Sequence, residues 1–252
     1  MEAAQDEKLR NLSQWVSESR RIVFFGGAGV STESGIPDFR SQDGLYSQQW
    51  AYPPETILSR TFFDRKPEEF YRFYREKMLC PKAKPGPAHL ALAKLEERGI
   101  LAAVVTQNID GLHQAAGSRR VLELHGSVLR NCCMSCGKFY PMEEILHSEG
   151  IPRCSCGGII KPDVVLYEET LDADTLRQSI EAISQADLLI VGGTSLAVYP
   201  AAGLLQYYRG RRLALINKSP TPYDQKADLL IRGSIGEALS SLLSPGEAGH
   251  EI

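Results

Sequence analysis

Short apolar runs rich in β-branched residues constrain the fold of this chain more than any other feature. Each has the length of a strand buried on both faces, and they lie at 21–25, 101–106, 188–191 and 213–216, with shorter candidates at 163–167 and 229–231. Stretches with helical spacing separate them at 87–98, 170–186 and 235–243. Continuous apolar strands that alternate with helices are typical of a parallel sheet covered on both faces. The sequence therefore predicts an open, doubly wound α/β domain.

Two inserts interrupt this alternation and predict a smaller domain beside the sheet. Residues 41–87 are rich in aromatic side chains and proline, which indicates a helical module. Residues 132–160 hold clustered cysteines and glycines, which indicates a metal-binding ribbon. The predicted sheet domain is discontinuous and comprises 1–40, 88–131 and 161–243, and the polar residues 244–252 are expected to be a frayed tail.

The composition excludes several classes of protein. With 252 residues, of which 43% are hydrophobic, the chain can bury a core, so global disorder is excluded. A formal charge of −3 supplies no basic surface, and no direct nucleic-acid binding is expected. The uncharged stretch 188–208 has the length of a membrane span, but Gly192, Gly193 and Pro200 interrupt it, so a strand, a loop and a helix are expected. We expect a cytoplasmic location, since the N-terminal residues lack the order of a signal peptide. We also expect a monomer.

Small and polar residues follow four of the predicted strands at the point where each ends. They are Gly26–Thr32, Gln107–Asp110, Gly192–Ser195 and Asn217. The carboxyl ends of parallel strands meet at one edge of a sheet, where ligands bind. We therefore predict one extended ligand crevice, although turns also collect such residues without any ligand. The glycine-rich turn alone is a weak signal, because Gly27 and Gly29 fit the dinucleotide fingerprint but Thr32 stands where its third glycine belongs.

The cysteines form the strongest local motif. Five of the six lie within 25 residues, and four of them form two short pairs, Cys133-x-x-Cys136 and Cys154-x-Cys156. Four thiolates suit tetrahedral Zn²⁺, and a site filled by protein ligands leaves no position for water, so the predicted role is structural. Cys132 is an alternative ligand, although two adjacent cysteines do not fit one site. Buried thiols without a metal are the other interpretation.

A single histidine is the first candidate for a general base. His125 lies between the second predicted strand and the cysteine ribbon. A lone histidine is more often a structural residue than a base, and His113 competes for the same role. Spacing alone identifies no serine or cysteine nucleophile with its histidine partner.

Five motifs occur in a fixed order along the chain. They are Gly27–Arg40, Thr106–His113, Leu124–Gly126, the paired cysteines and Gly193–Ser195. Together they resemble the Sir2 (sirtuin) family of NAD-dependent protein deacylases, and most closely its small bacterial members. The resemblance implies a Rossmann-like NAD-binding domain beside a smaller domain made of a zinc ribbon and a helical module. It also implies NAD as co-substrate and one structural Zn²⁺ held by the four paired cysteines.

The resemblance further implies which residues bind the cofactor. The pyrophosphate would lie along Ala28, Gly29, Thr32, Gly193, Thr194 and Ser195, and the adenosine would contact Asn217 and Ile235. The nicotinamide and its ribose would contact Gln107, Asn108, Ile109, Asp110 and His125. Phe39 and Arg40 would belong to a cofactor loop. His125 and Asn108 are the expected catalytic residues, with His125 as the general base.

The activity implied by the resemblance is NAD-dependent protein-lysine deacetylation. The acetyl group of acetyl-lysine passes to ADP-ribose, and nicotinamide, O-acetyl-ADP-ribose and free lysine are released. A neutral His125 would activate a ribose hydroxyl, and an unperturbed histidine pKa of about 6.5 suits that role. Mono-ADP-ribosyl transfer from the same site is the alternative. An NAD-sensing module fits less well with Asn108, Asp110 and His125, and a zinc-ribbon interaction protein would not need the crevice.

The implied partner is an acetylated protein or peptide. In the family an extended peptide pairs with backbone on both sides, and the matching residues here are Val164, Val165 and Leu166 on one side and Val198 on the other. One departure is clear: many relatives have Phe-Gly-Glu where this chain has Tyr167-Glu168-Glu169. Glu168 changes either the geometry of the loop or the local charge beside the peptide.

We predict that the chain removes acetyl groups well ahead of succinyl groups. Relatives that prefer succinyl-lysine carry Tyr-x-x-Arg on the helix of the acyl tunnel, whereas here Tyr71 is followed by Tyr74 at the arginine position. Arg72 and Arg75 are turned about 100° away along a helix. Burying a succinyl carboxylate without its cation is costly. The measurement is kcat/KM on one peptide with either acyl group, and a succinyl preference contradicts the prediction.

Overall fold

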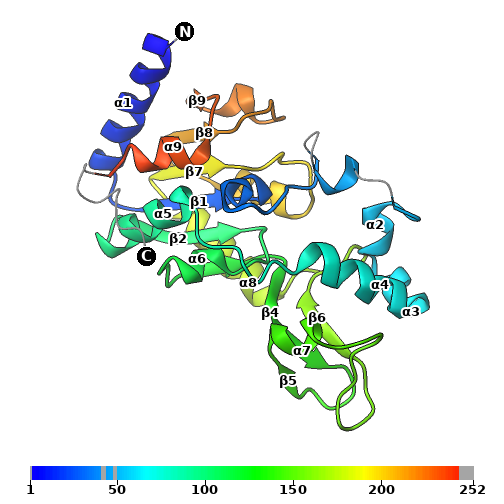
Figure 1. Ribbon diagram of the computed structural model, residues 1–252. Coiled ribbons are helices and arrows are strands. Elements are labelled where there is room, and N and C mark those ends of the chain that lie inside the picture. The colour runs from blue at the N-terminus through cyan, green and yellow to red at the C-terminus, as the bar shows by residue number, and fades with distance from the viewer. Residues whose placement is uncertain (1, 41–43, 48–49, 244–252) are drawn as a thin grey trace.

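The computed structural model describes residues 2–40, 44–47 and 50–243, and its largest element is the predicted parallel sheet (Figure 1). In this described part of the chain, six strands run parallel in the order β3-β2-β1-β7-β8-β9. They are β1 (Ile22–Gly26), β2 (Leu101–Thr106), β3 (Val121–Glu123), β7 (Leu188–Gly192), β8 (Arg212–Ile216) and β9 (Leu229–Ile231). The chain order reverses between β1 and β7, which makes their carboxyl ends the switch point of a doubly wound fold. The predicted fold class is confirmed.

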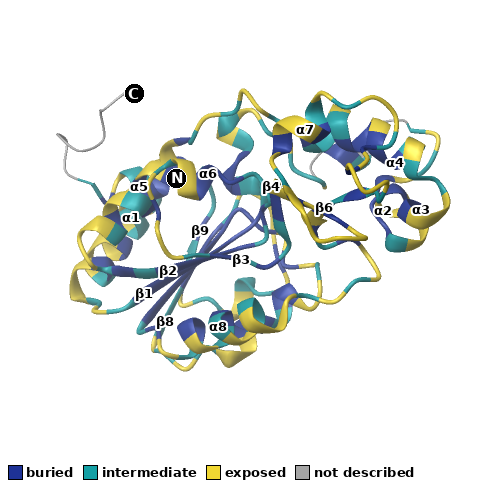
Figure 2. Cartoon of the chain, turned by 90° about the horizontal axis from the view of Figure 1, so that it is seen from below, coloured by how far each residue is buried: buried dark blue, intermediate teal, exposed yellow. Residues whose placement is uncertain are grey.

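Helices cover both faces of the sheet, because neighbouring side chains of a strand point to opposite faces. These helices are α1 (Glu2–Glu18), α5 (Pro87–Glu97), α6 (Leu112–Ala115), α8 (Ala173–Ser184) and α9 (Ile235–Ser240). On one face Ile22 and Phe24 of β1 share a core with α1, α5 and α9. On the other face Val23 and Phe25 share a core with α8 and the 3₁₀ turn Ala201–Tyr207. Figure 2 shows the buried sheet between its more exposed helices.

The two inserts fold together into a smaller body beside the sheet (Figure 1). It contains the antiparallel sheet β5-β4-β6 and four short helices: β4 (Gly126–Cys133), β5 (Phe139–Tyr140), β6 (Ile160–Val164), α2 (Pro54–Ile57), α3 (Arg60–Arg65), α4 (Pro67–Phe73) and α7 (Met142–Leu146). Phe63, Phe70 and Tyr71 of the helical module share one core with Ile145 and Ile160 of the ribbon. The ribbon and the module therefore form one domain, as predicted.

The small sheet extends beyond the predicted ribbon, 132–160. Its strands β4 and β6 pair from Cys133 opposite Ile160 back to Gly126 opposite Val164. These strand residues belong to the small sheet because β4 and β6 pair again at Gly126 and Val164, beyond an irregularity in the register between Asn131 and Gly126. The division of the chain at residues 131 and 161 stays a prediction.

Some elements differ from the expectation. No element was expected before residue 21, yet α1 buries Leu12 and Val16 against the sheet. The helix expected near residue 208 is the 3₁₀ turn Ala201–Tyr207, and the strand expected at 163–167 ends at Val164. Among the described helices, none is long and apolar enough to cross a membrane. The expected tail, 244–252, and residues 41–43 and 48–49 of the module lie outside the described residues.

His113 is an unusual core residue. It lies on α6, is 1% exposed, and packs its ring against Phe24 and His89 at centroid distances of 6.3 and 4.7 Å. Within the described residues, neither ring nitrogen has a hydrogen-bond partner. Burial, reinforced by His89, lowers the pKa of His113 to about 3. The folded protein therefore holds this histidine neutral under ordinary conditions.

We predict that this histidine makes the fold sensitive to acid. As the pH falls below about 6.5, His113 becomes protonated in the unfolded chain but stays neutral in the folded protein. Protonation therefore favours the unfolded state, and the stability drops. Between pH 7.5 and 5.0, the free energy of unfolding should fall by about 2 kcal/mol less in His113→Leu than in the unmodified protein. This difference follows from a contribution of about 1.4 kcal/mol per pH unit below pH 6.5. Urea unfolding at both pH values measures this, with the exposed His147→Gln as control. Equal losses in His113→Leu and the unmodified protein would contradict it.

Candidate active site

One large cleft, with a volume of about 980 Å³, opens at the carboxyl ends of the parallel strands. It contains every residue predicted to bind cofactor or peptide: Ala28, Gly29, Thr32, Phe39, Arg40, Gln107, Asn108, Ile109, Asp110, His125, Val164, Val165, Leu166, Gly193, Thr194, Ser195, Val198, Asn217 and Ile235. Segments separated by up to 207 residues, from Ala28 to Ile235, thus meet in one place. The roles of the individual residues stay predictions.

Two glycine turns form the floor of the cleft at the switch point. The backbone N–H of Gly29 donates to the carbonyl oxygen of Gly193 over 2.8 Å. A Cβ atom on Gly29 would lie 2.8 Å from the Gly193 Cα, and one on Gly193 would lie 2.5 Å from the Val30 nitrogen. Gly193 also has a φ of 59°, which favours glycine. The floor is therefore bare backbone, the surface that a pyrophosphate group needs, so the cleft fits a dinucleotide.

A buried hydrogen-bond network lies behind the strand ends. Ser31 Oγ donates to Asp110 Oδ2 over 2.7 Å and accepts from Asn108 Nδ2 over 2.9 Å. The N–H of Leu112 binds the other carboxylate oxygen over 2.9 Å. The Gly86 N–H donates to His89 Nδ1, so Nε2 carries the proton and faces Ser31 Oγ at 3.4 Å. These contacts fix the Asn108 amide and the Asp110 carboxylate in the cleft.

Sequence reasoning did not single out two members of this network. Ser31 lies inside the glycine-rich turn, where a hydroxyl looked like an ordinary turn residue. His89 lies 58 residues away on α5 and is fully buried, and burial lowers its pKa. The sequence contained no signal that joined them.

The geometry favours His125 over His113 as the base. His125 Nδ1 donates to the carbonyl oxygen of Gln107 over 2.9 Å, which leaves Nε2 as the acceptor nitrogen. Burial lowers the pKa of His125, and the bond to Gln107 opposes this only in part, so the ring is neutral near pH 7. His125 lines the cleft, whereas His113 is buried in the core. Gln107 is itself held by Thr194, whose Oγ1 accepts from Gln107 Nε2 over 3.0 Å.

The predicted peptide segment is attached to both domains. The Val165 N–H donates to the carbonyl oxygen of His125 over 2.9 Å, so this segment lies directly beside the candidate base. Two residues later, the Tyr167 N–H donates to the Leu58 carbonyl, and the Tyr167 carbonyl accepts from the Arg60 N–H, each over 3.0 Å. The segment is thereby held in an extended form.

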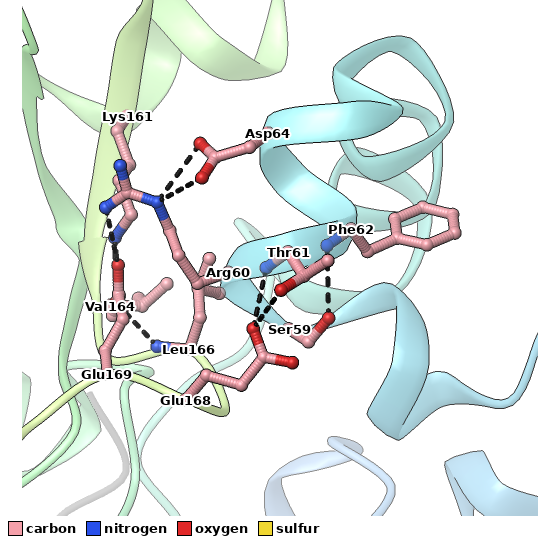
Figure 3. A network of polar contacts seen from close by, with 10 residues as sticks. All are labelled: Ser59, Arg60, Thr61, Phe62, Asp64, Lys161, Val164, Leu166, Glu168 and Glu169. Atoms are coloured by element: carbon pink, nitrogen blue, oxygen red, sulfur yellow. Dashed lines mark hydrogen bonds and ion pairs between the residues drawn. The ribbon is translucent and has the colours of Figure 1, made fainter.

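Glu168 affects the geometry of the loop. It has a φ of 77°, a left-handed conformation that suits the glycine of the family pattern. Its Oε2 accepts hydrogen bonds from the N–H and Oγ1 of Thr61 over 2.8 and 2.6 Å (Figure 3). These bonds lower the pKa of Glu168 and attach the turn to the start of α3. Glu169 accepts from Leu166 N–H, Lys161 Nζ and Arg60 within 3.2 Å.

Two residues of the helix predicted to line the acyl tunnel, Tyr74 and Arg75, point in the expected directions. Tyr74 lines the cleft, while Arg75 points to the ribbon and donates to Ser148 Oγ and the Gly150 carbonyl over 3.0 and 2.7 Å. Lys77, three residues after Tyr74 in the π-helix Tyr74–Met78, also lines the cleft, and its Nζ lies 3.3 Å from the Glu76 carboxylate. The sequence did not single it out. Helical spacing could have identified it. The acyl preference stays a prediction, and Lys77 is the cation that it must now take into account.

The four predicted metal ligands form a compact cluster. The Sγ atoms of Cys133, Cys136, Cys154 and Cys156 all lie within 4.8 Å of one another, whereas Cys132 is exposed and outside the cluster. The separation between Cys133 and Cys156 is 3.4 Å, and that between Cys136 and Cys154 is 3.6 Å. Four sulfurs around tetrahedral Zn²⁺ stand about 3.8 Å apart. The cluster therefore fits a structural zinc ion.

The fold and the site define a two-domain, Rossmann-like protein with a dinucleotide-sized cleft and a structural zinc ribbon. The model of the Sir2 family matches residues 27–200, and the chain belongs to this family. A protein of Clostridium perfringens strain 13 named NAD-dependent protein deacetylase is 60% identical over 242 residues, covering 94% of this chain and 99% of that protein. A solved Sir2 structure with a p53 peptide and NAD⁺ is 43% identical with a TM-score of 0.81, covering 92% of this chain and 95% of the other. A Sir2 protein bound to a propionylated peptide is 41% identical with a TM-score of 0.83, over 96% of this chain and 100% of the other.

Two adjacent cysteines provide a matched test of the zinc site. We predict that Cys133→Ser loses the zinc ion and unfolds at a lower temperature, because metal affinity contributes to folding free energy. Cys132→Ser should keep one zinc ion per chain and the original melting temperature, since Cys132 lies outside the cluster. Metal analysis and thermal unfolding measure both. Zinc loss in Cys132→Ser, or zinc retention in Cys133→Ser, would show that the ligand set is wrong.

Proposed function

We propose that this protein is an NAD-dependent protein-lysine deacetylase. It transfers the acetyl group of acetyl-lysine to ADP-ribose, consumes one water molecule, and releases nicotinamide, O-acetyl-ADP-ribose and free lysine. One observation carries the proposal: the free Nε2 of His125 lies in the same cleft as the glycine floor and the peptide segment. The deacetylase names of relatives up to 60% identical support it.

Residues on the floor and back of the cleft would hold NAD. Gly29 and Gly193 would present bare backbone to the pyrophosphate, and Asn217, which follows β8 and lines the cleft, would contact the adenosine ribose. Asp110 and Asn108, held by Ser31, would orient the carboxamide end of the cofactor. When bound, NAD supplies the ADP-ribose that accepts the acetyl group and the nicotinamide that leaves.

His125 would act as the general base for this transfer. Its Nδ1–H bond to Gln107 keeps Nε2 unprotonated, and its lowered pKa keeps the ring neutral near pH 7. The neutral nitrogen would take the proton from a ribose hydroxyl as that hydroxyl attacks the acyl carbon. Because Val165 is bonded to the His125 carbonyl, a peptide paired with Val164–Leu166 would deliver its acetyl-lysine beside this ring.

The proposed partner is an extended acetylated peptide within a protein substrate. It would pair on one side with Val164, Val165 and Leu166 and on the other with Val198, which lies across the cleft. Main-chain pairing reads little side-chain sequence, so modest selectivity follows. We further propose that the enzyme acts in the cytoplasm. It would act as a monomer, because a single chain supplies the whole cleft, and without nucleic acid, because its formal charge is −3.

The base is tested by replacing His125. We predict that His125→Ala lowers kcat by about 10²- to 10⁴-fold, the usual contribution of a general base, while ADP-ribose binding changes little. In the unmodified enzyme the acidic limb of kcat/KM should lie below pH 6.5, because burial lowers the pKa of His125 and the neutral form persists to lower pH.

Mass spectrometry of the reaction with NAD and an acetyl-lysine peptide measures the rate and identifies the product. O-acetyl-ADP-ribose is expected. ADP-ribose attached to the peptide or to the protein would instead indicate mono-ADP-ribosyl transfer. Unchanged turnover in His125→Ala, or an acidic limb above pH 6.5, would refute the assignment of the base.

A further inference from the structure

Tyr46 contacts both predicted residues of the cofactor loop, Phe39 and Arg40. Its N–H donates to the Phe39 carbonyl over 2.9 Å, and the Leu45 N–H donates to the Asp38 carbonyl over the same distance. The Phe39 ring meets the Tyr46 ring edge-on at 5.7 Å, and the Arg40 guanidinium lies 5.4 Å above it. A shift of Phe39 or Arg40, the two predicted loop residues, would therefore also shift Tyr46.

Tyr167 ends the predicted peptide segment. Its backbone is bonded to Leu58 and Arg60, and the turn that follows is attached to Thr61 through Glu168 (Figure 3). The side chain of Tyr167 therefore starts from a well-fixed backbone. A shift of the segment Val164–Leu166, with which a peptide would pair, would therefore also shift the Tyr167 side chain.

The hydroxyl groups of these two tyrosines meet. Tyr46 OH and Tyr167 OH lie 2.7 Å apart, although the residues are 121 positions apart in the chain, and both side chains line the cleft. Burial, together with this bond to Tyr167, raises the pKa of Tyr46, so its hydroxyl stays protonated and able to donate. Phenylalanine at position 167 would fill the same space without the hydrogen bond.

We propose that the Tyr46–Tyr167 hydroxyl pair is a positioning contact that couples binding of the acetylated peptide to binding of NAD, an inference that rests on the proposed function. A peptide paired with Val164–Leu166 would hold this segment, and with it Tyr167, in the position in which Tyr167 meets Tyr46. The hydroxyl bond then favours the arrangement of Phe39 and Arg40 seen here, in which the loop borders the cofactor cleft. By linkage, NAD favours peptide binding by the same factor. The pair does not touch the reacting atoms, so it acts on binding.

The test is a double-mutant cycle with Tyr46→Phe, Tyr167→Phe and the double variant in the zinc-loaded full chain. The dissociation constant of ADP-ribose, a probe that cannot turn over, is measured with and without a saturating acetyl-lysine peptide. The ratio of the two constants reports the coupling. Tyr207→Phe, which removes an exposed hydroxyl away from the cleft, is the matched control.

In the unmodified protein the peptide is expected to tighten ADP-ribose binding. Each single variant should lower this ratio by about two- to tenfold, the range for one hydrogen bond, and the double variant should lower it no further. Tyr207→Phe should keep the original ratio.

Several results would overturn the proposal. They are a ratio of 1 in the unmodified protein, ratios unchanged in both single variants, effects that multiply in the double variant, or a fall in kcat with an unchanged ratio. A variant that weakens ADP-ribose equally with and without peptide would show a merely structural role. The proposed function is tested separately, because an unmodified enzyme that forms no O-acetyl-ADP-ribose refutes it whatever the ratio.

Discussion

The contact between two glycine turns is the constraint on which the rest of the site depends. Gly29 and Gly193 touch backbone to backbone, and a Cβ atom on either would collide with the other turn. Because they follow β1 and β7, which pair in register from Ile22 opposite Leu188 to Gly26 opposite Gly192, the sheet itself brings them together. Gln107 then reaches Thr194 across the same gap. A side chain at either glycine would part the strand ends and disperse the residues around them.

The cleft joins two bodies with separate cores. The sheet and its helices enclose two hydrophobic cores, one on each face of the sheet, and the ribbon and helical module share a third. The peptide segment runs between them, bonded to His125 on one side and to Leu58 and Arg60 on the other. A change in the relative position of the two bodies must therefore move this segment. This geometry explains why contacts outside the reacting centre, such as the one at Tyr167, can affect ligand binding.

Five strands of the large sheet (β1, β2, β7, β8 and β9), the helices α5, α8 and α9, and the cysteine set could be predicted, because hydrophobic period and local spacing encode them. The sequence did not predict β3 or α1. Cys133 belongs to the cluster and Cys132 does not, and strand alternation explains the difference. The two side chains point to opposite faces of β4, so one is buried and the other exposed. What could not be predicted depends on distant partners. Ser31 meets His89 only because two faces of the fold converge, and the pairing of β4 with β6 is invisible in either strand alone.

Glu168 shows how a local rule can be broken when tertiary contacts compensate. Its left-handed backbone is unfavourable for a residue with a side chain, and glycine would adopt it freely. The same carboxylate accepts two hydrogen bonds from Thr61, which glycine could not make. Strain in one residue is thus exchanged for a fixed connection between the peptide segment and α3.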